Sequence, residues 1–123
     1  MTAHTETLTR NTLSAKTLIG DKVRNGARED LGKIEDLMVD LTSGRIAYAV
    51  LSFGGFLGMG NKLFAVPFRA MTIDSAEHAF VLDVPKDRLK QAPGFDKDNW
   101  PDASDLGYRS QIYSFYNVPR DWE

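Results

Sequence analysis

Cysteine is absent from the 123-residue chain, and histidine occurs only twice. Without cysteine there can be no disulfide bond, no thiolate metal site and no thiol catalysis. The two histidines, His4 and His78, are far apart in the sequence and have no second ligand at a suitable spacing. Since a catalytic zinc site takes about three protein ligands, we expect neither a metal ion nor a cofactor.

A long apolar run and an excess of positive charge are also missing. The longest unbroken apolar segment, Ile46 to Leu51, is far shorter than the ~20 residues of a membrane-spanning helix. The first residues, Met1 to Thr7, lack the apolar centre of a signal peptide. The formal net charge is −2, so no general positive field attracts nucleic acid or anionic lipid. These absences predict a soluble, cytoplasmic protein without membrane insertion and disfavour nucleic acid as its ligand.

The remaining composition is that of one globular domain. Hydrophobic residues make up 42% of the chain and charged residues 26%, as in ordinary soluble proteins. Residues 1–12 are polar and aperiodic, which predicts a flexible arm. We expect residues 13–85 to form the domain and residues 86–123 to form a tail that packs on it, because about forty residues alone make a poor core.

The most regular pattern lies between residues 31 and 68, where three apolar runs of strand length are separated by turn signals. Over residues 36–41, Leu37, Val39 and Leu41 alternate with Asp36, Met38 and Asp40, a period of two as in a half-buried strand. Ile34 breaks this alternation and predicts a β-bulge beside it. The run 45–53 is apolar on both faces, which predicts a strand that is covered on both sides.

Turn and breaker residues delimit further short strands. Asn25-Gly26 predicts a hairpin from about Asp21 into Lys33, because both residues tolerate positive φ. Pro67 has no N–H to donate and is expected to end the fourth strand. Short apolar runs at 69–73 and 79–84 follow it. The pattern therefore predicts a mainly β fold, a small antiparallel barrel of six strands.

The chain after residue 84 favours a short helical extension. Pro85 suits the start of a helix over 86–91. From Asp102 to Tyr116, apolar and aromatic residues recur at spacings of three and four, and Asp102 is the expected N-cap. We thus expect the barrel to carry a C-terminal tail that is partly helical and partly extended.

The order of these segments resembles the PRC-barrel family, which is named after the cytoplasmic part of the H subunit of the photosynthetic reaction centre. The resemblance covers roughly residues 13 to 85 and rests on spacing, over Leu18-Ile19-Gly20, Leu31 to Asp40, Thr42 to Ile46 and Val66 to Met71. Two later segments, Ala92 to Phe95 and Trp100-Pro101, are similar to the tails of stand-alone bacterial members. The resemblance implies a six-stranded β-barrel used as a protein-interaction module, often dimeric, without common catalytic residues.

The first candidate for a partner or dimer surface is the glycine-rich stretch 54–61, which carries Phe56, Leu57 and Met59. Large apolar side chains exposed together mark interaction sites. The same residues can instead fold back onto the barrel, and both interpretations remain open. Phosphate binding is disfavoured, because a strand and not a helix follows these glycines.

The second candidate is the aromatic C-terminus, with Tyr113, Tyr116 and Trp122. These residue types are favoured at interface hot spots. Aromatic residues can also stack on single-stranded bases, but nearby aspartates disfavour a phosphate backbone. We rank packing on the barrel first, a protein interface second and RNA third.

Catalysis finds little support in the sequence. Asp36 and Asp40 fall on one strand face as the one pair suited to acid/base chemistry, but such residues more often satisfy turn donors. We therefore predict a non-catalytic protein-interaction module whose partner is a second copy or another protein. The alternative is an accessory factor that binds a small ligand or RNA.

Overall fold

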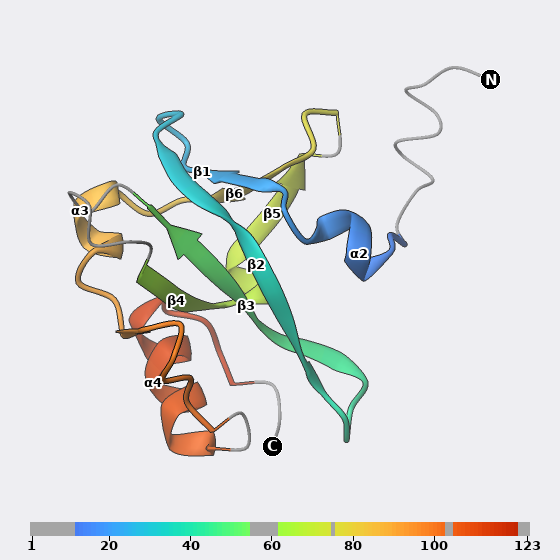
Figure 1. Ribbon diagram of the computed structural model, residues 1–123, viewed down its shortest axis with the longest axis vertical. Coiled ribbons are helices and arrows are strands. Elements are labelled where there is room, and N and C mark those ends of the chain that lie inside the picture. Colours follow the sequence, from blue (N-terminus) through green and yellow to red (C-terminus); the bar gives the residue numbers. More distant parts are fainter. Residues whose placement is uncertain (1–11, 55–61, 75, 103–104, 121–123) are drawn as a thin grey trace.

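The computed structural model describes residues 12–54, 62–74, 76–102 and 105–120 (Figure 1). The strands are β1 (Lys22–Arg24), β2 (Asp30–Asp40), β3 (Arg45–Phe53), β4 (Lys62–Pro67), β5 (Met71–Asp74), β6 (Ala79–Leu82) and β7 (Gly94–Phe95). The helices are α2 (Ala15–Leu18), α3 (Lys86–Leu89) and α4 (Leu106–Phe115), with a 3-10 turn, η1, at Phe68–Ala70. The described strands form one sheet in the order β5-β6-β1-β2-β3-β4-β7.

β1 and β2 form the predicted hairpin, but the turn works differently from the expectation. Positive φ occurs at Arg28 (66°) and not at Asn25-Gly26. The Asn25 side chain instead closes the loop, since its Nδ2 donates to Glu29 Oε1 at 2.8 Å and its Oδ1 accepts from Glu29 N at 2.9 Å. Hydrogen bonding by the asparagine side chain therefore shapes this connection.

The pairing of β2 with β3 confirms two expectations. The register shifts between Ile34 and Asp36, where the sequence predicts a bulge. Every residue of β3 from Ala47 to Phe53 is buried. Ala49 and Leu51 belong to the main core cluster, whereas Tyr48 and Val50 belong to a second cluster beneath α4. β3 is thus covered on both sides, as its apolar pattern indicates.

The sheet does not close into the predicted six-stranded antiparallel barrel. The described residues contain seven strands, with β5 and β7 at the two ends of the order. β1 and β6 run parallel, with Lys22 opposite Ala79 and Arg24 opposite Val81. Pro67 ends β4 as expected, and η1 then turns the chain so that β5 pairs with β6. The mainly β class and the C-terminal helix are correct, and barrel closure and purely antiparallel pairing are not.

The seventh strand and the C-terminal helix come from the segment after residue 85. Phe95 of β7 pairs with Leu63 of β4. α4 begins three residues later than predicted, because Asp105 is its N-cap: Asp105 Oδ1 accepts from Gly107 N at 2.9 Å and from Tyr108 N at 3.2 Å. Figure 1 shows α4 beside β3 and β4, and the β2–β3 hairpin reaching beyond the rest of the sheet.

Candidate interaction surface

α4 lies on the face of β3 and β4 opposite the main core. Its two most deeply buried side chains, Ile112 and Tyr113, are 0% and 1% exposed. They pack in one cluster with residues of the two strands, chiefly Ala47, Val50, Leu63 and Ala65. We call these four residues and Asp40, which lies at the end of β2, the α4 seat. The two alanines leave room for large side chains of the helix, as close packing requires.

A charge pair anchors α4 at one end of the seat. Arg109 lies on the buried face of the helix, and its Nη1 donates to Asp40 Oδ2 at 2.9 Å. The other oxygen, Asp40 Oδ1, accepts from Thr42 N at 2.9 Å and from Ser43 N at 3.2 Å. These bonds, chiefly that from Arg109, hold the pKa of Asp40 below its usual value. One carboxylate therefore fixes both the β2–β3 turn and the helix.

A neutral hydrogen bond anchors the middle of α4. The Tyr113 hydroxyl donates to the Ala47 carbonyl oxygen at 2.7 Å, in a buried position. Tyr108 meets Tyr48 edge-on, with ring centroids 6.3 Å apart. Burial raises the pKa of Tyr108 to about 12. The aromatic side chains of the helix thus pack against the sheet and make specific contacts there.

The C-terminal end of α4 is held from α3. Arg88 Nη2 donates to the Phe115 carbonyl oxygen at 2.9 Å, and its guanidinium carbon lies 4.3 Å from the centroid of the Phe115 ring. A cation is favourable at this end of a helix, where carbonyl groups lack partners within the helix. Tyr116 packs against the main core cluster, and burial raises its pKa.

The predicted surface residues are placed as follows. Tyr113 is buried in the monomer and Tyr116 is half-buried, so both pack on the sheet, the arrangement that ranks first for the aromatic terminus. In this fold Tyr113 contributes to the protein interior and presents almost no surface to a partner. The other predicted residues lie outside the described part of the chain: Phe56, Leu57, Met59 and Trp122.

Exposed apolar side chains are close in sequence to each member of the charge pair. Val39 and Leu41 flank Asp40 and are 54% and 92% exposed, and Leu106, one turn before Arg109, is 53% exposed. We call Val39, Leu41 and Leu106 the apolar rim. The alternation over 36–41 predicts a half-buried strand here, which is wrong for its last residues. The hairpin extends past the core, so nothing among the described residues covers them.

The Asp40–Arg109 pair was not predicted, although the sequence carries a signal for it. Arg109 occupies the same helical face as Ile112 and Tyr113, at spacings of three and four. A charged side chain on a buried helix face needs a partner of opposite charge. The sequence does not say which of the 17 acidic residues supplies it.

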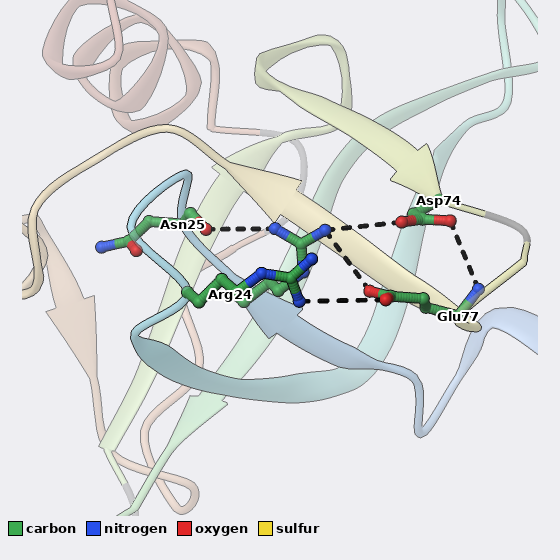
Figure 2. A network of polar contacts seen from close by, with 5 residues as sticks. Arg24, Asn25, Asp74 and Glu77 are labelled. Carbon is green, nitrogen blue, oxygen red and sulfur yellow. Dashed lines mark hydrogen bonds and ion pairs between the residues drawn. The ribbon is translucent and has the colours of Figure 1, made fainter.

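A second polar network joins β1 to the β5–β6 turn (Figure 2). Arg24 Nη2 lies 3.4 Å from both Asp74 Oδ2 and Glu77 Oε1, and Arg24 Nη1 donates to the Asn25 carbonyl oxygen at 3.2 Å. Arg28 Nη1 lies 3.8 Å from Glu77 Oε2. Two arginines face two carboxylates, so the charges balance, and the network ties together segments that are distant in sequence.

The two aspartates considered for acid/base chemistry both accept hydrogen bonds within the fold. Asp36 Oδ1 accepts from Leu37 N at 2.8 Å, and Asp40 is engaged as above. Within the described ranges, no three His, Cys, Asp or Glu side chains are grouped so as to hold a metal ion. No helix in that part of the chain is long and apolar enough to span a membrane.

The fold is a small mixed sheet with a helix on its outer face. Comparison with known proteins shows the family to which the chain belongs. The PRC-barrel domain matches residues 10–89, well over half of the chain. The chain therefore belongs to the PRC-barrel domain family. The match ends before β7 and α4, so the α4 seat lies inside the family domain and the helix that occupies it lies outside.

Among solved structures, the chain is similar to RimM of Pseudomonas aeruginosa, a protein named for 16S ribosomal RNA processing. The sequence identity is 21% and the TM-score 0.43, and the alignment covers 65% of this chain and 48% of RimM. The chain thus spans about half the length of that structure. No curated protein matches the chain.

Proposed function

We propose that this chain is a non-catalytic protein-interaction module that associates with a second copy of itself or with another protein. The observation that carries the proposal is the apolar rim. Val39, Leu41 and Leu106 are large apolar side chains, each more than half exposed. Val39 lies in β2, Leu41 directly follows it and Leu106 begins α4. Large exposed apolar side chains are typical of interaction surfaces.

The glycine-rich stretch provides a second candidate surface at the other end of β3. Phe53 at the end of β3 pairs with Lys62 at the start of β4, so the two described residues on either side of this stretch lie opposite each other in the sheet. The Asp40–Arg109 pair lies near Arg45, where β3 begins. Association through Phe56 and Leu57 is therefore separable by mutation from association through the rim.

The proposal includes the tail and the location predicted from the sequence. Residues 86–123 serve as a tail of the family domain, and contacts of β7 and α4 with β4 support this. The cytoplasm is the proposed location, which the composition supports.

The test is the molar mass in solution, measured by light scattering over a range of concentrations. We expect the wild-type protein to self-associate. Leu41→Lys or the double change Phe56→Asp with Leu57→Asp should abolish the association without changing the far-UV circular dichroism spectrum. The variant that loses association identifies the surface.

If the wild-type protein is monomeric at every concentration, the next step is to search for a different partner protein. Affinity capture from the source cell, with the same two variants as controls, then decides. A protein captured by wild type and lost with one variant supports an interaction module. Capture that is equal for wild type and both variants contradicts it.

A further inference from the structure

We propose that Asn25-Gly26 is a modification site, at which Asn25 loses its amide by deamidation when the connection between β1 and β2 opens. Asn25 is the only asparagine of the chain that a glycine follows. The backbone nitrogen of the next residue attacks the side chain of an asparagine, and a glycine favours this attack because it has no Cβ to obstruct it. The proposal is independent of the interaction surface proposed above.

The reaction needs water and no other reactant. Gly26 N forms a bond to Asn25 Cγ, the bond from Cγ to Nδ2 breaks, and the side-chain nitrogen leaves as ammonia with the proton of the Gly26 N–H. Water then opens the succinimide ring at one of its two carbonyl carbons. Addition at Cγ gives aspartate, and addition at the main-chain carbonyl carbon gives isoaspartate, in which the backbone runs through the former side chain.

The folded protein holds the side-chain amide of Asn25 away from this reaction. Asn25 is 3% exposed, and its Nδ2 donates to Glu29 Oε1 at 2.8 Å and to the Val84 carbonyl oxygen at 3.2 Å. Its Oδ1 accepts from Glu29 N at 2.9 Å. Figure 2 shows this amide pointing away from Arg24. Cyclisation must break these three hydrogen bonds, because Cγ has to turn onto Gly26 N.

Hydrogen bonds also hold the peptide group between Asn25 and Gly26. The Asn25 carbonyl oxygen accepts from Arg28 N at 3.0 Å and from Arg24 Nη1 at 3.2 Å, the second of which is drawn in Figure 2. In the described part of the chain Gly26 N donates to no acceptor, and Gly26 is exposed. The attacking nitrogen is therefore available and the attacked amide is restrained, so the opening of the Asn25 contacts sets the rate.

The product disrupts the contacts that protect the site. An aspartate side chain has no N–H to donate, so the Val84 carbonyl oxygen loses its donor. A carboxylate oxygen also replaces Nδ2 at 2.8 Å from Glu29 Oε1, and two carboxylates this close repel each other. Glu29 Oε1 accepts from Lys86 N at 3.4 Å as well, at the start of α3. Deamidation thus weakens the link between this connection and α3 and makes a reversible opening permanent.

The first experiment compares the deamidation rate of the folded and the unfolded full-length protein. Two wild-type samples are kept at the same mildly alkaline pH, one in buffer and one in guanidinium chloride. Peptide mass spectrometry follows the conversion of the Asn25 amide into an acid. We expect a rate at least tenfold higher in denaturant, because the folded protein reacts only from its open form. Equal rates, or no deamidation in denaturant, overturn the proposal.

Three variants identify the protecting contact and the reacting bond. Glu29→Ala removes the carboxylate that holds Nδ2 and should raise the rate in buffer without changing the rate in denaturant. Glu35→Ala, at an exposed position of β2 outside this network, is the matched control and should react as wild type does. Gly26→Ala adds a Cβ beside the attacking nitrogen and should slow the reaction in denaturant. A Glu29→Ala protein that reacts in buffer no faster than Glu35→Ala overturns the protection by the fold.

The second experiment tests the effect of the product on the fold. Asn25→Asp should lower the melting temperature at neutral pH. Glu29→Gln in the same chain should restore part of the loss, because the glutamine Nε2 can donate to the new carboxylate. A double variant that is no more stable than Asn25→Asp, or an Asn25→Asp protein that melts with wild type, overturns the permanent opening. The rate experiment uses wild-type protein and decides the proposal even if Asn25→Asp does not fold.

Discussion

Arg109 of α4 donates to Asp40 at the end of β2 over 2.9 Å, although 69 positions separate the two residues in the sequence. The same carboxylate accepts two backbone N–H groups of the β2–β3 turn. The conformation of the hairpin and the docking of the helix are thus linked through one side chain. This link leads to the first of four predictions.

Asp40→Asn should lower the melting temperature most at neutral pH. Arg109 and the turn N–H groups lower the pKa of Asp40 in the folded protein. A carboxyl with a lowered folded pKa stabilises the fold above its unfolded pKa of about 4, and this contribution disappears as the pH falls through the folded value. Melting curves of wild type and variant from pH 7 to pH 2.5 test this. A difference that stays constant over this range contradicts it.

Tyr113→Phe and Tyr108→Phe should differ in their effect on stability. Tyr113 donates a buried hydrogen bond to Ala47 O, so its loss should lower the free energy of unfolding by about 0.5–1.5 kcal/mol. The Tyr108 hydroxyl is buried without a hydrogen-bond partner among the described residues, and its removal should be neutral or stabilising. Urea denaturation measures both. Equal losses for the two variants contradict the hydrogen-bond assignment.

Gly32→Ala should be far more destabilising than Gly44→Ala. Both glycines have positive φ, 114° and 76°, which strains any other residue. A Cβ at Gly32 also collides with the Ser52 carbonyl oxygen of the neighbouring strand, whereas a Cβ at Gly44 meets nothing within 4 Å. We expect a loss of about 3 kcal/mol or more at Gly32 and of roughly 1 kcal/mol at Gly44. Denaturation midpoints that coincide contradict this.

Ile112→Ala should release α4, and Leu106→Ala should not. Ile112 is 0% exposed and Leu106 is 53% exposed on the same helix. Truncation of the buried residue should cost about 2–5 kcal/mol and that of the exposed one less than about 0.5 kcal/mol. Hydrogen exchange measures the effect locally, with faster exchange of α4 amides expected only for Ile112→Ala. Unchanged protection of α4 in both variants contradicts the assigned packing.

Expectations that depend on neighbouring residues were correct in the central part of the fold. The bulge beside Ile34, the end of a strand at Pro67 and the two-sided burial of β3, from Ala47 to Phe53, all appear in the structure. Each follows from side-chain periodicity or from the missing N–H of proline. The family was also evident from the spacing of such segments.

The expectations that failed concern residues far apart in the sequence. A local pattern contains no information on which strand β1 joins, and the parallel β1–β6 pair replaces the predicted barrel closure. Leu41 continues an apolar alternation, yet it is 92% exposed because the hairpin extends past the core. Periodicity shows which face of a strand is apolar, but not how far the sheet beneath it extends.

The sequence by itself determined the family, the central strands and the presence of an amphipathic helix near the C-terminus, since each depends on short-range patterns. Only the tertiary structure showed that this helix covers β3 and β4 and that Arg109 binds Asp40. The physical reason is that the seat of the helix consists of residues from three strands, which come together only when the sheet forms.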